Sequence, residues 1–349
     1  MEFSRRQTLI GGSALIGSGL LPGLGGAQAA QTATLAFGPS TPIYSLGMIA
    51  EAKGFFKSEN LDFKLVLGNA GTHGRQALAA GQALFAHGDA SHPLQLSTRG
   101  KKCRIILASQ LIASISNIVV RKDLFDAGIT TVEKLADYKR PDGAKPIVAA
   151  TAIGSGTWMY GTYVFEAKKL GDRINWVAGG GPKTMFPGLE TKQFDAIMAV
   201  PGWVVEAEAK GFGKVIYDTS KPGVFTDAFG GTVPVLVIYT LEETIQSNKA
   251  LVQSFVNGMY QAMKYVKSAP DEEVYKLIAE KHFAGIDPVA TKTEMFFDKR
   301  TWAYDGRFDK AAFERGGKVW YRKGSDIPES KFEDLVDLSF LDAAQAKFK

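Results

Sequence analysis

Residues 43–67 read IYSLGMIAEAKGFFKSENLDFKLVL, and this stretch decides the fold. Apolar residues recur at helical spacing over residues 43–56, and a strand-like apolar run follows at residues 63–67. Another short apolar run, at residues 34–37, precedes the helix. A strand, a helix and a strand in this order predict a parallel β–α–β unit, which is typical of α/β proteins.

The same alternation continues along the chain, so we expect α/β lobes built on mostly parallel sheets. Further strands are expected at residues 84–87, 104–109, 146–150, 175–177 and 195–200, and further helices at residues 74–80, 132–137, 157–170, 183–190 and 203–209. Residues 122–131 are expected to form a loop.

Two long β-rich runs interrupt this alternation and predict the connections between two lobes. They lie at residues 116–121 and 232–239, and beyond the second run helical patterns dominate. The chain has 349 residues, more than a single hydrophobic core usually supports. We expect residues 31–118 and 240–349 to form lobe one and residues 119–239 to form lobe two. A helix is expected after the second run, and its apolar face should pack against lobe one. That face consists of Leu251, Phe255, Met259, Met263 and Val266.

Residues 1–30 have the anatomy of an export signal peptide. Arg5 and Arg6 form a basic head, residues 9–24 a weakly apolar middle, and Ala27-Gln28-Ala29 a cleavage pattern. The head resembles a twin-arginine signal, which predicts export to the periplasm by that route. A membrane anchor is the alternative, but glycines and Pro22 interrupt an apolar run shorter than the ~20 residues of a span.

Composition excludes several other classes of protein. Cys103 is the single cysteine, so the chain can form no internal disulfide, and no lipid-anchored cysteine stands at the cleavage site. The net charge is +5, without a basic tract interleaved with aromatic residues, so we expect no nucleic-acid partner. His73 and His92 have no neighbouring cluster of carboxylates, and we expect neither a metal site nor a cofactor.

Two motifs carry a family resemblance. Residues 50–61, AEAKGFFKSENL, and residues 77–86, ALAAGQALFA, resemble the solute-binding proteins of nitrate/sulfonate/taurine-type ABC importers, the NMT1/THI5-like or SsuA-like family. Leu84 stands where that family usually has aspartate. The resemblance implies an α/β, type II periplasmic-binding-protein fold with two lobes joined by two crossover segments. It also implies a small-molecule solute, an ABC permease with its ATPase as partners, and a monomer that is not membrane-embedded after signal cleavage.

Ligands of open α/β sheets bind where strands end, and two facing lobes double the number of such loops. The predicted ligand-binding residues are Ser40, Thr41, Pro42, Tyr44, His73, Asp89, Ser91, Gln110, Gly154, Ser155, Gly156, Thr157, Pro201 and Trp203. A helix beginning near Thr157 favours anions at its N-terminus. With the aromatic and hydroxyl side chains nearby, it predicts a small organic anion of the sulfonate or aromatic carboxylate class.

Each candidate keeps a structural alternative. Ser155 or Thr157 can be a plain helix cap, and Trp203 can be a core residue packed between a helix and a sheet. A neutral heterocycle such as a pyrimidine is the alternative ligand.

Other functions are compatible with the same fold. A THI5-like pyrimidine-related enzyme is one, although its relatives use a cysteine-rich segment and this chain has only Cys103. We expect no enzyme and no catalytic residues. The binding component of a TRAP importer or of a sensor kinase is the other alternative.

Overall fold

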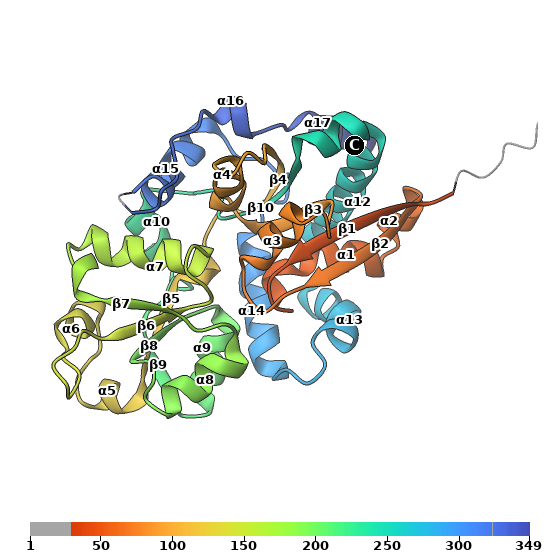
Figure 1. The fold of residues 1–349 in the computed structure, drawn as a ribbon. Coiled ribbons are helices and arrows are strands. Elements are labelled where there is room, and N and C mark those ends of the chain that lie inside the picture. The colour runs from red at the N-terminus through yellow and green to blue at the C-terminus, as the bar shows by residue number, and fades with distance from the viewer. Residues whose placement is uncertain (1–28, 323) are drawn as a thin grey trace, which may run out of the picture.

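The computed structural model describes residues 29–322 and 324–349 and shows two α/β lobes side by side (Figure 1). Each lobe contains one five-stranded sheet, with strand order β2-β1-β3-β10-β4 in the first lobe and β7-β6-β8-β5-β9 in the second. The strands are β1 (Gln31–Phe37), β2 (Leu61–Leu67), β3 (Phe85–Asp89), β4 (Cys103–Gln110), β5 (Asn117–Arg121), β6 (Ile147–Ala150), β7 (Asn175–Ala178), β8 (Ala196–Ala199), β9 (Gly213–Tyr217) and β10 (Leu236–Leu241).

Helices surround both sheets. Those from the first part of the chain are η1 (Pro42–Tyr44), α1 (Ser45–Ala52), α2 (Phe55–Ser58), α3 (His73–Ala79), α4 (Ser91–Ser97), η2 (Ser114–Ser116), α5 (Lys122–Asp126), α6 (Val132–Asp137), α7 (Gly156–Ala167) and η3 (Gly171–Arg173). The others are α8 (Pro182–Glu190), α9 (Pro201–Ala209), α10 (Val224–Phe229), α11 (Glu242–Ser247), α12 (Lys249–Ser268), α13 (Asp271–His282), α14 (Pro288–Thr301), α15 (Lys310–Trp320), α16 (Phe332–Leu335) and α17 (Ser339–Lys347).

The sheets are less parallel than the sequence predicted. In lobe one β1 pairs in parallel with β2 and β3, but β10 is antiparallel to both of its neighbours, β3 and β4. In lobe two β5 is likewise antiparallel to β8 and β9. The reason is that β5 and β10 are the first strands after the chain crosses from one lobe to the other. Each of them therefore starts at the end of the sheet where the other strands finish.

Several local predictions differ from the structure. The helix predicted over residues 43–56 is divided into η1, α1 and α2. The break between α1 and α2 occurs because Gly54 takes a left-handed conformation, with φ of 72°. The predicted loop after β5 contains α5, and α4, β9 and α10 were not predicted. The chain is already back in the first sheet at Leu236, a few residues before the predicted boundary at residue 239.

Helix α12 packs on lobe one, as the spacing of its apolar residues predicted. Leu251, Met259 and Met263 are all buried along its inner face. The ring of Phe255 stacks on that of Phe85 from β3, with centroids 3.8 Å apart. This apolar face joins the helix-rich C-terminal third of the chain to the first sheet.

Two segments connect the lobes, and one asparagine fixes both of them to lobe two. Asn117, at the start of β5, is fully buried. Its Nδ2 donates to the carbonyl oxygens of Ser114 (2.9 Å) and Ala199 (3.0 Å). Its Oδ1 accepts hydrogen bonds from the backbone N–H and the hydroxyl of Thr219, each at 2.8 Å. Since Ser114 lies on the first connection and Thr219 on the second, this amide ties the two connections together.

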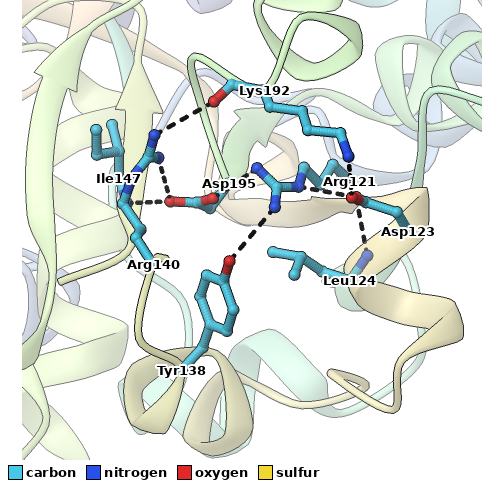
Figure 2. Close-up of polar contacts among 8 residues, drawn as sticks. All are labelled: Arg121, Asp123, Leu124, Tyr138, Arg140, Ile147, Lys192 and Asp195. Carbon is cyan, nitrogen blue, oxygen red and sulfur yellow. Dashed lines mark hydrogen bonds and ion pairs between the residues drawn. The ribbon is translucent and has the colours of Figure 1, made fainter. Parts of the chain in front are cut away.

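A buried ion-pair network lies at the end of the second sheet that faces away from lobe one (Figure 2). Asp195 is fully buried, and it accepts from Arg121 Nη1 at 2.9 Å, Arg140 Nη1 at 2.7 Å and the backbone N–H of Ile147 at 2.8 Å. Arg121 ends β5, Arg140 lies in the segment before β6, Ile147 begins β6, and Asp195 itself precedes β8. One carboxylate therefore connects three strands at the edge away from lobe one.

The predicted export signal, residues 1–30, lies almost entirely outside the described residues. Within residues 29–322 and 324–349, none of the helices combines the length and the apolar character needed to cross a membrane.

We predict that Asp195→Asn lowers the free energy of unfolding by ~3 kcal/mol, because it leaves Arg140 without a carboxylate partner and leaves Arg121 with only the half-exposed Asp123. The measurement is urea unfolding followed by circular dichroism. Asp126→Asn is the matched control, since Asp126 pairs with Lys122 but its side chain is 56% exposed, and its loss should cost under about 1 kcal/mol. Equal losses from the two substitutions would contradict the structural role of Asp195.

Candidate functional site

A cavity lies between the lobes, at the edge where the strands of both sheets end. Lobe one contributes Pro39, Thr41, Ile43, Tyr44, Gly71, Asp89, His92 and Leu236, the first connection contributes Ile115, and lobe two contributes Thr151, Gly156, Thr157, Val200 and Trp203. The cavity volume is about 40 Å³, which is room for about three water molecules. The lobes therefore leave little free space between them at this point, although the cavity is not sealed from solvent.

Six of the fourteen predicted ligand-binding residues line this cavity. They are Thr41, Tyr44, Asp89, Gly156, Thr157 and Trp203. The others lie outside the lining, and most of them have structural roles. Three of them begin or cap helices: Pro42 begins η1, Pro201 begins α9, and Ser155 caps α7. Four make hydrogen bonds within the protein: Ser40 donates to the carbonyl of His282, Ser91 donates its N–H to Asp89, Gln110 donates to Asp298, and the carbonyl of Gly154 accepts from Gln95. His73 packs against Gly68.

Eight lining residues are not among those fourteen: Pro39, Ile43 and Gly71, which lie in the same loops after strands as the predicted residues, and His92, Ile115, Thr151, Val200 and Leu236. Thr151 and Val200 directly follow β6 and β8, so the rule that ligands bind where strands end could have found them. Ile115 and Leu236 lie on or next to the connections between the lobes. Their apolar side chains look like ordinary core residues in the sequence.

Asp89 is the charged residue of the lining. It ends β3 and is 2% exposed, and its Oδ1 accepts the N–H of Ser91 at 2.9 Å. Its Oδ2 is buried without a hydrogen-bond partner. Burial raises the pKa of this carboxyl to about 6, against the smaller opposing effects of the hydrogen bonds from Ser91. The group is thus ionised at neutral pH, although it lies in an apolar site.

The same carboxylate faces the N-terminus of a helix in the other lobe. A Cβ atom added to Gly156, the first residue of α7, would lie 3.0 Å from Asp89 Oδ2 and 2.8 Å from Ile115 Cδ1. Only a glycine lets the two lobes approach this closely. The positive end of the α7 dipole is therefore next to a negative charge from lobe one.

His92 and Tyr44 lie beside Asp89. Both ring nitrogens of His92 are buried without a hydrogen-bond partner, and burial lowers its pKa well below the ordinary value, so the imidazole is neutral. Tyr44 stacks on Phe37 with centroids 4.9 Å apart and meets His87 edge-on at 5.1 Å. Among the described residues, no group of three or more His, Cys, Asp or Glu side chains could hold a metal ion.

The sequence profile of the NMT1-like family matches residues 26–280. The chain belongs to the NMT1-like family. This match confirms the resemblance that the motifs at residues 50–61 and 77–86 indicated. No curated protein matches this NMT1-like chain in sequence.

Solved structures show the same fold. A protein from Bordetella bronchiseptica RB50 superimposes with a TM-score of 0.76 and 25% identity, over 92% of this chain and 98% of that one. The periplasmic nitrate-binding protein NrtA from Synechocystis PCC 6803 gives a TM-score of 0.72 and 12% identity, over 92% and 89%. The alkanesulfonate-binding protein SsuA from Xanthomonas axonopodis pv. citri, bound to MOPS, gives 0.60 and 14%, over 78% and 85%. The predicted periplasmic-binding-protein fold is confirmed.

The fold is also found in an enzyme. The desulfurization enzyme DSZB superimposes with a TM-score of 0.61 and 17% identity, over 91% of this chain and all of that one. Fold alone therefore does not separate binding from catalysis, and the argument for this NMT1-like chain depends on its own cleft.

Beside the cavity, a carboxylate of lobe one bonds to backbone groups of both lobes. Glu294 of α14 is 1% exposed, and its Oε1 accepts the N–H of Ile43 at 3.3 Å. The N–H of Gly202, in the first turn of α9, also donates to it, as does the hydroxyl of Thr41. A Cβ atom on Gly202 would lie 2.6 Å from Glu294 Oε2. Glu294 thus connects two cavity loops that belong to different lobes.

A second buried acid lies one turn further along α14. Asp298 is fully buried and accepts from Gln110 Nε2 at 3.0 Å, and the hydroxyl of Ser114 also acts on this carboxyl. Burial raises the pKa of Asp298 to about 7, and burial together with the nearby Asp298 raises that of Glu294. The sequence showed no sign of this pair, because the two residues are far from the cleft loops along the chain.

We predict that Asp298→Asn stabilises the protein more at pH 8 than at pH 5. The folded chain keeps the Asp298 proton up to about pH 7, whereas the unfolded chain releases it near pH 4, so this group's contribution to the free energy of unfolding falls as the pH rises between these values. Asparagine removes that loss and can still accept from Gln110. The measurement is the melting temperature of both proteins at each pH.

Asp126→Asn, on the exposed surface, is the control for the change in net charge. The same difference in melting temperature between Asp298→Asn and the parent protein at pH 5 and at pH 8 would show that Asp298 does not titrate in this range.

Proposed function

We propose that this chain is the exported solute-binding component of an ABC importer, which takes up a small organic molecule between its lobes and delivers it to the permease and its ATPase. The observation that carries the proposal is the cavity lined by strand ends of both lobes. Contacts from both sides favour the closed state when a solute is present, and the closed shape is what a permease can recognise. Membership of the NMT1-like family and the likeness to NrtA and SsuA support the same function.

The solute class has arguments on both sides. A small organic anion, such as a sulfonate or an aromatic carboxylate, has the N-terminus of α7 in its favour, because Gly156 and Thr157 line the cavity there. Against it, the lining includes the carboxylate of Asp89 and neither lysine nor arginine. The side chains therefore give better support to the alternative, a neutral heterocycle.

Periplasmic location, export by the twin-arginine route, the monomeric state and the absence of catalysis all stay predictions. A TRAP permease or a sensor kinase could receive the same closed shape. Transport assays in cells that lack the ABC permease distinguish these partners. Solute uptake should be lost in those cells if the proposal holds, and should persist if another partner receives the protein.

We predict that Gly156→Val abolishes solute-induced closure and leaves the fold intact. A Cβ atom at this position would lie 3.0 Å from Asp89 Oδ2, so the valine methyl groups would meet lobe one only when the lobes are together, while the end of the Ile115 side chain must shift slightly in either state. Small-angle scattering should show compaction of the parent protein on addition of a binding solute, and none for the variant.

Ala144→Val, on an exposed loop of lobe two, is the control and should compact normally. Compaction of Gly156→Val to the size of the parent protein would show that closure does not bring α7 against lobe one.

A further inference from the structure

The cavity contains buried polar atoms that the protein itself leaves without hydrogen bonds. Asp89 Oδ2 and both ring nitrogens of His92 are such atoms, and both residues line the cavity. Burying a polar group without a partner costs about 1–3 kcal/mol, and more for a charged group, so such atoms are rare unless something else satisfies them. Their position between the lobes indicates that a solute supplies the missing partners.

The chemistry of Asp89 decides what that partner must be. An ionised carboxylate only accepts hydrogen bonds, and the neutral imidazole of His92 offers one donor and one acceptor. The cation that acts on Asp89 from outside the cavity is Arg75 on α3, whose effect on the pKa of Asp89 is smaller than that of burial. No ion pair or hydrogen bond joins these two described residues, so the charge of Asp89 remains available to a solute.

The same geometry weakens the argument for an anionic solute. That argument depended on the positive N-terminus of α7, but in the closed structure Asp89 already faces this helix end at Gly156. An anion placed there would meet the carboxylate at short range in a site of low dielectric constant.

Apart from the hydroxyl groups of Thr41, Thr151 and Thr157, the remaining walls are apolar or aromatic. Ile43, Ile115, Val200 and Leu236 surround the cavity, with the rings of Tyr44 and Trp203 among them. Such walls favour a flat, largely apolar body with few polar groups.

We propose that the solute is a small, largely apolar or aromatic molecule that donates hydrogen bonds from nitrogen to Asp89, with His92 as the neighbouring polar contact. This inference rests on the proposed function and adds the class of solute to it. Amines, amidines and N–H heterocycles belong to the class, whereas carboxylates and sulfonates do not.

The test uses three probes of nearly the same shape: benzamidinium, benzamide and benzoate, which carry charges of +1, 0 and −1. Calorimetry with the full mature chain should give the tightest binding for benzamidinium or benzamide and the weakest for benzoate. Asp89→Asn keeps the acceptor for the N–H of Ser91, so it should fold. It should weaken benzamidinium binding about tenfold or more, since a hydrogen bond to a charged group is lost, and it should strengthen benzoate binding.

Asp62→Asn, whose side chain is 52% exposed in lobe one, carries the same change of net charge and should leave all three affinities unchanged. Benzoate as the tightest probe, with the order unaltered in Asp89→Asn, would overturn the solute class but leave the proposed function standing. If none of the three probes, nor a wider set of amines, N–H heterocycles, sulfonates and carboxylates, bound or compacted the protein, the proposed function would fall and this inference with it.

Discussion

The geometry of the cleft depends on how the side-chain amide of Asn117 is bonded. Its two donors and its acceptor oxygen are used for Ser114, Ala199 and Thr219, so both connections between the lobes start from one fixed point in lobe two. A buried amide with all its hydrogen bonds made resists displacement, because any shift leaves several polar groups unpaired. Ile115, between Ser114 and Asn117, is held at the cavity by the same arrangement. Rotation of the lobes must then take place in the connections beyond this point.

Across the cleft, the two lobes meet at two places where an acidic side chain approaches the N-terminus of a helix. Asp89 faces the N-terminus of α7, and Glu294 accepts the N–H of Gly202 near the N-terminus of α9. In both cases the carboxylate comes from lobe one and the helix from lobe two, and a glycine permits the close approach. Burial keeps the pKa of Glu294 well above its ordinary value, so its contact with α9 is a hydrogen bond, whereas the charge of Asp89 and the dipole of α7 attract each other when the lobes are together. Closure therefore has a favourable contribution of its own, and much of the positive potential at the N-terminus of α7 is balanced before a solute arrives.

The sequence predicted the fold better than it predicted the cleft, and the reason is physical. Apolar periodicity is a local property, so the order of strands and helices and the burial of α12 could be inferred from spacing alone. The antiparallel direction of β5 and β10 could not be inferred in this way, because it depends on the end of the sheet at which the chain enters each lobe. Thr41 and Gly156 were found because they follow strands, whereas Glu294 comes from a distant helix. Burial of that carboxylate depends entirely on the packing of α14 against α9, which no local pattern encodes.

Whether such a cleft binds or reacts depends on the groups that reach it, because the fold supports both. Cys103, the one cysteine of the chain, begins β4, whereas the cleft lies at the other end of that strand, beyond Gln110. Burial raises the pKa of its thiol to about 12, so the reactive thiolate is scarce at neutral pH. Asp89 and His92 share no hydrogen bond, and a neutral imidazole beside an unpaired carboxylate offers two separate contacts to a solute. Such groups fit recognition, in which a ligand completes the hydrogen bonding of the site and leaves it unchanged on release.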